Sequence, residues 1–332
     1  MNSEVVKFKF SKKEKWLVTG AAGFIASHAI DALIAGEQEV VGLDNFLTGQ
    51  KKNIDRVRDR IQFIEGDIRD FDTCKNACQK VDRVLHFAAL GSVPRSLLEP
   101  RLSFEINAQG FVNIIEAARV AGVQRLVYSS SSSVYGDDAT LPKKESVIGN
   151  ALSPYAASKR SNELTAEIYR RAFNFSVVGL RYFNVFGPRQ SPEGPYAAVI
   201  PQWILKLKSG ERATINGDGS TSRDFCPVAN VVTANLAAAY AKHDIVAGQI
   251  YNIALGQRTT LIELHAKIVR ELKSASVVVR EPEIYFGPWR KGDILHSHAE
   301  IQMAQNDLAY TPIVTVDEGL KRTVRWFLDQ PN

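Results

Sequence analysis

Three groups of residues in this sequence have types and spacings that suit redox chemistry on a hydroxyl group. Gly20 and Gly23 lie near the start, a run of serines occupies 129–133, and Tyr155 precedes Lys159 by four residues. The glycines can hold the phosphates of a dinucleotide, and the tyrosine and lysine can move a proton. Each pattern is weak alone, but their order along one chain predicts a dinucleotide-dependent active site.

The Tyr155 and Lys159 pair is expected on one face of a helix. Ser153 and Pro154 are typical of a helix N-cap and the first helical position, and a spacing of four residues is about one turn. A lysine ammonium beside the phenol lowers the tyrosine pKa from about 10, so that tyrosine can act as a base near neutral pH. Oxidised nicotinamide adds to that effect. An isolated Tyr-x-x-x-Lys pattern is more often a solvated helix face, so the other two groups decide its meaning.

The serine run follows the apolar residues 126–128 of an expected strand. It therefore lies at the carboxyl end of that strand, the edge where ligands bind in open α/β sheets. Ser131, Ser132 and Ser133 are the candidates to share a proton with Tyr155 and a substrate hydroxyl. A flexible polar turn is the alternative.

The glycine pattern reads Gly20-x-x-Gly23-x-x-Ala26 and stands between an expected strand and an expected helix. Gly20 permits a tight turn, and Gly23 lets the backbone approach a pyrophosphate at the positive end of the helix. Ala26 replaces the third glycine of many such loops. A plain strand-to-helix turn is the alternative.

Two acidic residues end the next expected strands. Asp44 is placed to accept hydrogen bonds from the adenosine ribose hydroxyls and to repel a 2′-phosphate, which favours NAD over NADP. Asp67 ends the third strand, at the edge where an adenine can lie. Its alternative role is the N-cap of a helix.

Short apolar runs alternate with helical stretches through the first half of the chain. The expected strands are 16–19, 39–43, 61–64, 83–87, 125–128 and 176–180, with a first helix over 25–35. This alternation predicts an α/β fold, a Rossmann-type doubly wound parallel sheet.

The second half contains more proline and glycine and shorter strands. Strands over 213–216 and 249–253 and helices over 261–272 and 316–328 are expected there. We predict an NAD-binding Rossmann domain over 1–186 and a smaller C-terminal α/β substrate lobe over 187–332. Whether late segments return to the first domain is left open.

Composition excludes several classes of protein. Of 332 residues, 45% are hydrophobic and 23% are charged, no stretch approaches a membrane span of about 20 apolar residues, and 1–16 lacks the apolar centre of a signal peptide. The net charge of +5 is dispersed, which gives nucleic-acid binding little support. We expect a cytoplasmic protein without a nucleic-acid or membrane partner.

The three cysteines form an odd and sparse set, which suits a reducing compartment. Cys74 and Cys78 lie four apart on an expected helix, but no further cysteine or histidine cluster completes a zinc site. No metal is expected.

These residues resemble the extended short-chain dehydrogenase/reductase family, and within it the NAD-dependent nucleotide-sugar epimerases and dehydratases. The resemblance covers nearly the whole chain. It is sharpest in six segments, 89–96, 181–187, 198–201, 216–219, 221–226 and 290–293. They look like the bacterial UDP-N-acetylglucosamine 4-epimerases of surface polysaccharide synthesis, including relatives that act on the corresponding uronic acid.

The resemblance implies a role for each matching residue. Tyr155 matches the family's base, Lys159 its ribose-binding lysine and Ser131 its catalytic serine or threonine, while Asn107 matches an asparagine that braces the site and is otherwise a plain buried amide. The implied cofactor-binding residues are Gly20, Gly23, Phe24, Ile25, Asp44, Asn45, Asp67, Ile68, Ala88, Ala89, Asn107, Tyr155, Lys159 and Val185. The implied substrate-binding residues are Gly91, Ser92, Ser131, Asn184, Ala198, Val199, Asn216, Arg223, Arg290, Asp293 and Ser297, with the arginines facing the diphosphate.

The implied reaction is 4-epimerisation, which interconverts UDP-N-acetylglucosamine and UDP-N-acetylgalactosamine. Tyr155 removes the proton of the sugar 4-hydroxyl while NAD takes hydride from carbon 4. The resulting 4-keto sugar turns and receives the hydride on its other face. Related dehydratases place an Asp-Glu pair after the catalytic threonine, where this chain has Ser132 and Ser133, so dehydration is not expected.

Other readings stay open. The closest is the same reaction on UDP-N-acetylhexosaminuronic acids, with Arg95 or His298 meeting the carboxylate, although either residue is more often an ordinary surface or packing residue. A different enzyme class is a decarboxylase or reductase of nucleotide sugars, and decarboxylation would require an additional acidic residue at the serine cluster, which this sequence lacks. A non-catalytic dinucleotide-sensing protein needs no Tyr155, Lys159 and Ser131 together.

Two further expectations concern assembly and the sugar pocket. The helical stretches 104–118 and 155–173 have apolar positions that can pair with a second copy in a four-helix bundle, as in the family, which predicts a homodimer. Ser297 matches a position where relatives carry a small or a bulky residue. With Gly91, Ser92 and Ala198 it leaves room for an N-acetyl group; a surface turn is the alternative for Ser297.

Overall fold

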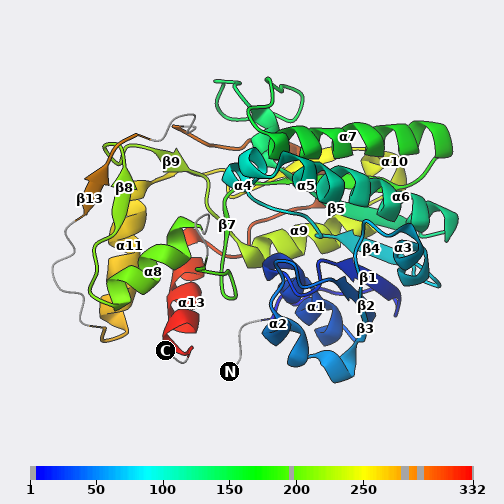
Figure 1. Ribbon diagram of the computed structural model, residues 1–332, viewed down its shortest axis with the longest axis horizontal. Helices are drawn as coiled ribbons and strands as arrows, with labels where there is room; N and C mark the ends of the chain where they lie inside the picture. The colour runs from blue at the N-terminus through cyan, green and yellow to red at the C-terminus, as the bar shows by residue number, and fades with distance from the viewer. Residues whose placement is uncertain (1–4, 194–197, 278–283, 290–294, 331–332) are drawn as a thin grey trace.

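A seven-stranded parallel sheet forms the centre of the molecule in the computed structural model, which describes residues 5–193, 198–277, 284–289 and 295–330 (Figure 1). The strand order is β11-β6-β5-β4-β1-β2-β3. The strands are β1 Lys15–Thr19, β2 Glu39–Asp44, β3 Gln62–Glu65, β4 Arg83–His86, β5 Arg125–Ser131, β6 Val177–Tyr182 and β11 Ile250–Ile253. The predicted doubly wound α/β fold is confirmed.

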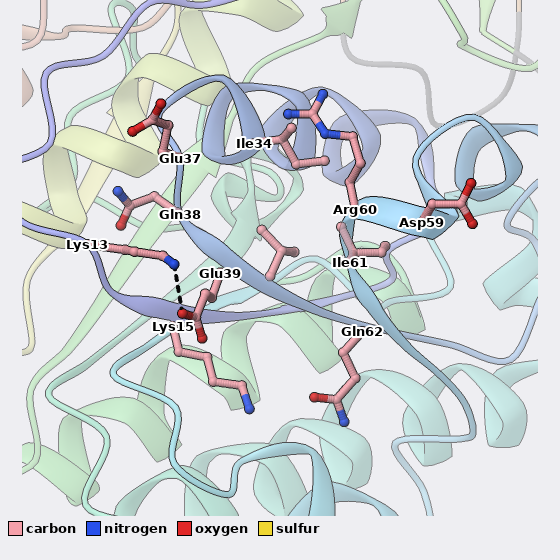
Figure 2. Close-up of a pocket in the computed structure, with 11 residues that line it drawn as sticks. Lys13, Lys15, Ile34, Glu37, Gln38, Glu39, Asp59, Arg60, Ile61 and Gln62 are labelled. Atoms are coloured by element: carbon pink, nitrogen blue, oxygen red, sulfur yellow. Dashed lines mark ion pairs between the residues drawn. The ribbon is translucent and has the colours of Figure 1, made fainter.

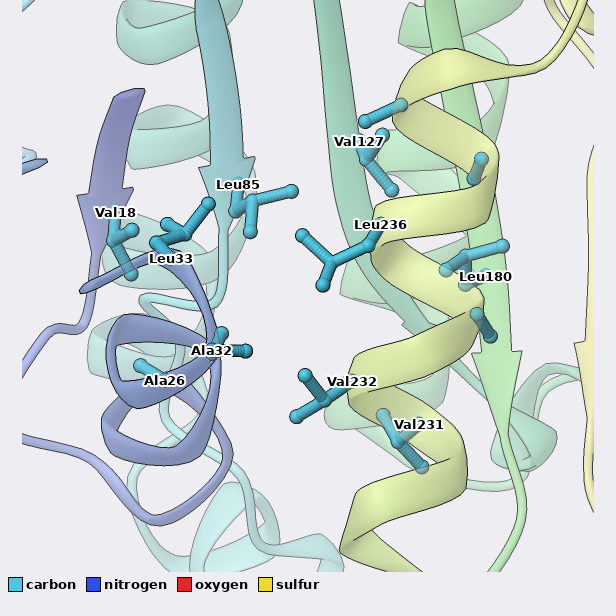
Figure 3. Close-up of a cluster of buried hydrophobic side chains, with 14 of the residues drawn as sticks. Val18, Ala26, Ala32, Leu33, Leu85, Val127, Leu180, Val231, Val232 and Leu236 are labelled. Atoms are coloured by element: carbon cyan, nitrogen blue, oxygen red, sulfur yellow. The ribbon is translucent and has the colours of Figure 1, made fainter. Parts of the chain in front are cut away.

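Helices cover both faces of this sheet. One face carries α1 (Phe24–Ala35) and α9 (Val228–Tyr240), whose apolar side chains meet Val18, Leu85, Val127 and Leu180 of four strands (Figure 3). The other face carries α3 (Phe71–Ala77), α6 (Gly110–Val120) and α7 (Pro154–Phe173). Burial of the strands on both sides explains their continuous apolar runs.

A second, smaller hydrophobic core is formed by residues that follow β6 in the chain. It is built by α8 (Val199–Lys208), α11 (Leu261–Ser274) and α13 (Val316–Leu328) around side chains such as Trp203, Ile268 and Phe327. The parallel pair β8 (Thr214–Asn216) and β13 (Tyr285–Gly287) borders it. Thr260 and Glu263 form a capping box that fixes the start of α11.

Short elements connect these parts. They are α2 Lys51–Asp55, η1 Arg58–Arg60, α4 Val93–Leu98, α5 Pro100–Phe104, the π-helix η2 Glu105–Gln109, η3 Ser132–Tyr135, β7 Val185–Phe186, β9 Ser222–Arg223, β10 Cys226–Pro227, α10 His243–Val246, β12 Thr259–Thr260 and α12 Gln302–Leu308. Within the described parts of the chain, no helix has the length and apolarity needed to cross a membrane.

One expected strand needs correction, and one question that the sequence left open is answered. The strand expected over 125–128 runs on to Ser131, because Ser129, Ser130 and Ser131 pair in register with β6. The strand expected over 249–253 among the late segments joins the first sheet as β11, where Ile250 pairs with Gly179. α9 and β11 therefore complete the sheet from beyond residue 187, and the domain boundary at 186 stays a prediction.

Candidate active site

The candidate catalytic side chains meet where α7 passes the end of β5. Ser153 caps α7, its hydroxyl oxygen accepting a hydrogen bond from the Ala156 amide at 3.1 Å, and Pro154 follows at the first helical position. Tyr155 and Lys159 then lie one turn apart. The Nζ atom of Lys159 is 5.9 Å from the centre of the Tyr155 ring and donates a hydrogen bond to the Ser129 carbonyl oxygen at 2.9 Å.

Burial governs the protonation of this pair. It lowers the pKa of Lys159 to about 8, while Glu163 acts in the opposite direction. Burial also raises the pKa of Tyr155 from 10.0, against a hydrogen bond from Ser131 that lowers it. Lowering of the pKa of Tyr155 by the Lys159 ammonium stays a prediction.

Among the three candidate hydroxyls, Ser131 is the one that hydrogen-bonds to Tyr155. Its oxygen also accepts hydrogen bonds from the Ser133 amide at 3.1 Å and from the Ser133 hydroxyl at 3.0 Å. Ser131 thereby caps η3, which begins at Ser132. Ser131 is therefore the candidate to share a proton with Tyr155, and Ser133 is placed to hold the Ser131 hydroxyl.

The glycine turn after β1 has no room for side chains. Gly20 has a φ of +67°, and a β-carbon there would lie 2.8 Å from the Ala88 amide nitrogen. A β-carbon on Gly23 would lie 2.9 Å from the Gly20 carbonyl oxygen. Gly23 is also the N-cap of α1, so no side chain caps the amides that begin at Phe24 and Ile25. This bare helix start fits the pyrophosphate of a dinucleotide.

A buried histidine, which the sequence reasoning did not single out, supports this turn. The Thr19 hydroxyl lies 2.8 Å from Nδ1 of His86 and accepts a hydrogen bond from the Ala88 amide at 3.2 Å. Burial lowers the pKa of His86 to about 3. The neutral ring therefore links the end of β4 to Thr19 of β1, and Thr19 in turn holds the Ala88 amide. Its position at the end of an expected strand was the signal available in the sequence.

Asp44 and Asp67 both face the same pocket. The carboxylate of Asp44 accepts hydrogen bonds from the Ala22 amide at 2.9 Å and the Phe46 amide at 2.7 Å, and burial raises its pKa. Asp44 thus anchors the glycine turn, and its contact with a ribose stays a prediction.

Asp67 has a different set of partners. Arg69 contacts it at 2.7 Å and lowers its pKa, and Asn45 donates a hydrogen bond to it at 2.8 Å. The helix N-cap alternative is wrong, because Asp70 caps α3.

This pocket gathers most of the predicted cofactor-binding residues. From that set it is lined by Gly20, Gly23, Asp44, Asn45, Asp67, Ile68, Ala88 and Ala89. It is also lined by residues that we did not predict, Leu43, Leu47, Thr48, Gly49, Gly66, Phe87, Leu90 and Ile106. Most of these are apolar or small, as expected for the walls of an adenosine site.

Asn107 lies outside that lining and braces it from behind. The residue is buried in the π-helix η2, and its Oδ1 accepts a hydrogen bond from the Leu90 amide at 2.7 Å. Its Nδ2 donates to the Ser158 hydroxyl at 3.2 Å. The asparagine therefore links the segment after β4 to α7, between Tyr155 and Lys159. Val185, also predicted for the cofactor, lies in β7.

The predicted substrate residues come from both cores. Ser92 caps α4 next to Gly91, Asn184 has a φ of +33°, and Ala198 and Val199 begin α8. Asn216 ends β8. Arg290 and Asp293 lie outside the described residues.

Arg223 and Ser297 belong to one assembly. Nη1 of Arg223 donates a hydrogen bond to the Leu295 carbonyl oxygen at 3.0 Å, and the Ser297 amide donates to the Ser222 carbonyl oxygen at 3.0 Å. Strand β9 therefore holds the segment that presents Ser297.

The structure also places Arg95, His298 and the two neighbouring cysteines. Arg95 forms an ion pair with Glu99 at 2.6 Å, and Nε2 of His298 lies 3.1 Å from the Gly256 carbonyl oxygen. Cys74 and Cys78 are buried, which raises the pKa of both thiols to about 12. In the residues described, His, Cys, Asp and Glu form no group of three or more that could hold a metal ion.

A second hollow lies at the amino ends of β1, β2 and β3 (Figure 2). It is lined by charged side chains of both signs, including Lys13 and Glu39, which form an ion pair at 2.9 Å. Ligands of open α/β sheets bind at the opposite, carboxyl edge. The pocket at Gly20 and Asp44 is therefore the candidate site.

Comparison with known proteins gives the family. The model of the NAD dependent epimerase/dehydratase family matches residues 16–254. The chain belongs to this family. Membership confirms the predicted resemblance and NAD as the cofactor, and it makes the protein an NAD-dependent enzyme.

Three relatives show how far the similarity extends. A putative UDP-glucose 4-epimerase of Methanocaldococcus jannaschii is 38% identical over 93% of this chain and 97% of its own length. A solved UDP-N-acetylglucosamine 4-epimerase from Methanobrevibacter ruminantium M1, in complex with UDP-N-acetylmuramic acid, has a TM-score of 0.90 at 35% identity over 96% of this chain and 100% of that chain. A UDP-glucuronic acid 4-epimerase from Bacillus cereus, in complex with UDP-glucuronic acid and NAD, has a TM-score of 0.84 at 29% identity over 95% and 99%.

Proposed function

We propose that this member of the family is a 4-epimerase that interconverts UDP-N-acetylglucosamine and UDP-N-acetylgalactosamine through a 4-keto intermediate. The observation that carries the proposal is the convergence of Ser131, Tyr155 and Lys159 where α7 passes the end of β5, with hydroxyls and no carboxylate at 132 and 133. Relatives named as UDP-sugar 4-epimerases match the chain over nearly its whole length.

The side chains divide the work as follows. NAD, when bound, would supply the reversible hydride chemistry that oxidation and reduction at carbon 4 of the sugar require. Tyr155 takes the proton of the 4-hydroxyl and later gives it back, and Ser131 holds that proton's path through its hydrogen bond to the phenol. Lys159 supplies positive charge beside Tyr155 and an ammonium for the ribose. Asp44 and the uncapped start of α1 hold the dinucleotide.

The serines argue against dehydration. Elimination of water from a sugar needs an acid and a base next to the redox site, a task for carboxyl groups. Ser132 and Ser133 occupy η3 at that place, and Ser133 is engaged with Ser131. Neither hydroxyl can exchange protons readily near neutral pH.

Small side chains support an N-acetylated substrate. Gly91, Ser92, Ala198 and Ser297 leave space in the region where the resemblance places the sugar. The alternative, a uronic acid, wants a cation for its carboxylate. Arg95 is paired with Glu99, and His298 faces the Gly256 carbonyl oxygen. These contacts favour the uncharged sugar.

Exposed apolar side chains support a homodimer. Val112 and Val120 on α6 are exposed, as are Leu164, Ile168 and Phe173 on α7. The two helices run side by side on one flank of the sheet (Figure 1). Pairing them with the same helices of a second copy would bury these residues in a four-helix bundle. A role in surface polysaccharide synthesis and a cytoplasmic location stay predictions from the sequence resemblance.

One experiment tests the function directly. Purified protein is offered UDP-N-acetylglucosamine, UDP-glucose and UDP-N-acetylglucosaminuronic acid separately, without added NADH, and products are followed by NMR. We expect the 4-epimer of the first sugar to form fastest. Fastest turnover of the uronic acid would overturn the substrate assignment, and a 4-keto-6-deoxy product would overturn the reaction.

A further inference from the structure

A buried carboxylate lies one helical turn beyond Lys159. Glu163 is 2% exposed. Its Oε1 accepts hydrogen bonds from the Ser130 hydroxyl at 2.6 Å and Nε of Arg181 at 2.8 Å. Its Oε2 accepts from Nη2 of Arg181 at 2.9 Å and Nη1 of Arg160 at 3.0 Å. The two contacts with Arg181 form a bidentate pair, which fixes the carboxylate in place.

Glu163 joins the elements that carry the catalytic groups. It follows Tyr155 and Lys159 at intervals of four residues and so lies on the same face of α7. Ser130, which it holds, lies in β5 between Ser129 and Ser131. Ser129 receives the hydrogen bond of Lys159, and Ser131 hydrogen-bonds to Tyr155. The carboxylate therefore connects α7, which carries Tyr155 and Lys159, with the end of β5, which carries Ser131.

Among the described residues, few charged groups act on Lys159. His86 of β4 lies near it and is neutral, because burial lowers its pKa to about 3. On the same helix Lys159 lies near the Tyr155 ring, and in β5 the Ser129 carbonyl oxygen accepts its hydrogen bond. Glu163 is the negative charge that opposes the effect of burial on the pKa of Lys159. Arg181 and Arg160 reduce that negative charge, Arg181 from the interior and Arg160 from a side chain that is 39% exposed.

We propose that Glu163 is a positioning residue of this site: its charge keeps the Lys159 ammonium protonated, and its hydrogen bond to Ser130 fixes the strand end that presents Ser131. The inference rests on the proposed function where sugar turnover is measured. A residue that served folding alone would leave the pH dependence of the reaction unchanged. The two roles separate when charge and length are varied independently.

The pH dependence of kcat for UDP-N-acetylglucosamine tests the charge. Glu163→Gln leaves Arg181 and Arg160 unopposed, so we expect the alkaline limb to move to lower pH by about 1 unit. Glu163→Asp keeps the charge and shortens the side chain, so the limb should stay in place while kcat falls about 10-fold. Arg160→Gln removes a positive charge, so the limb should move slightly to higher pH.

The three variants together decide the matter. Equal shifts for Glu163→Gln and Glu163→Asp, or no shift for Glu163→Gln with bound NAD retained, would overturn the proposal. Should Glu163→Gln fail to fold, Arg160→Gln takes its place in the test. An alkaline limb of Arg160→Gln that stays in place or moves to lower pH would then overturn the proposal.

A stability measurement needs no sugar. The Tm, measured with NAD added in large excess so that every variant is saturated, is compared for Lys159→Met, Glu163→Gln and the double variant. Opposite charges that attract should make the loss of Tm in the double variant smaller than the sum of the single losses. Additive losses would contradict the coupling. This arm gives its result even if no UDP-sugar is epimerised, so failure of the function and failure of the inference are distinguishable.

Discussion

The Nζ atom of Lys159 lies 5.9 Å from the centre of the Tyr155 ring, one turn along the same helix. Its hydrogen bond goes to the Ser129 carbonyl oxygen at 2.9 Å, so we expect the ammonium to act on the phenol through space. The direct hydrogen bond to Tyr155 comes from Ser131. These two residues therefore influence Tyr155 by different means, which separate substitutions can resolve.

Tyr155→Phe should lower kcat about 10²- to 10⁴-fold, because it removes the proton acceptor and keeps the ring. NAD content, measured after denaturation of the purified protein, should match that of the wild type. Activity near the wild-type level would contradict the assignment of Tyr155 as the base.

Lys159→Met should lower both NAD content and kcat, the latter about 10- to 100-fold, because one pKa unit at Tyr155 is a tenfold change in its ionised fraction. Met has a similar length and carries no charge. The pH profile of the variant should also lose the ionisation of Lys159. An unchanged profile together with full NAD content would rule out this role.

Ser297→Tyr should impair turnover of UDP-N-acetylglucosamine and spare UDP-glucose. The larger side chain fills the space of the N-acetyl group, a change of about 10- to 100-fold in the ratio of kcat/KM for the two sugars. UDP-glucose is the internal control, because Tyr155 and NAD are common to both reactions. Equal losses would mean that Ser297 does not sense the N-acetyl group.

Ile168→Glu should weaken the homodimer, since Ile168 is 59% exposed on α7 and would be buried in the pairing that we propose. Light scattering measures the molar mass at several concentrations. Arg325→Glu, on the distant α13, gives the same new side chain as a control and should leave the dimer intact (Figure 1). A wild-type protein that runs as a monomer would exclude this interface.

Acid should destabilise the protein through His86. Its pKa is about 3 when folded and about 6.5 when unfolded, so the unfolded chain binds the proton first and stability falls as the pH drops below 6.5. Between pH 6.5 and 5 this amounts to about 2 kcal/mol. Urea unfolding of His86→Asn should show a smaller loss over the same range, and an equal loss would contradict the argument.

The sequence predicted those features that depend on local pattern. The strands and the helix over 316–328 follow from the spacing of apolar residues, and the order of the glycine, serine and tyrosine groups indicated one site. The pairing of Glu163 with Arg181 was not predicted, because the two residues lie 18 positions apart on different elements and meet only when α7 packs on β6. The π-helix that holds Asn107 has no simple pattern either. The length of β5 was underestimated because serines have little strand preference, and pairing with β6 overrides it.

The position of β11 at the edge of the sheet determines when the sheet can be completed as the chain is synthesised. Strand β6, which ends at Tyr182, keeps one side unpaired until residues 250–253 have left the ribosome, and α9 arrives only shortly before. A nascent chain that stops at residue 186 therefore exposes the apolar face that α9 covers and an open strand edge, both of which favour aggregation. Ribosome-bound chains should become resistant to protease only once their length allows β11 to emerge.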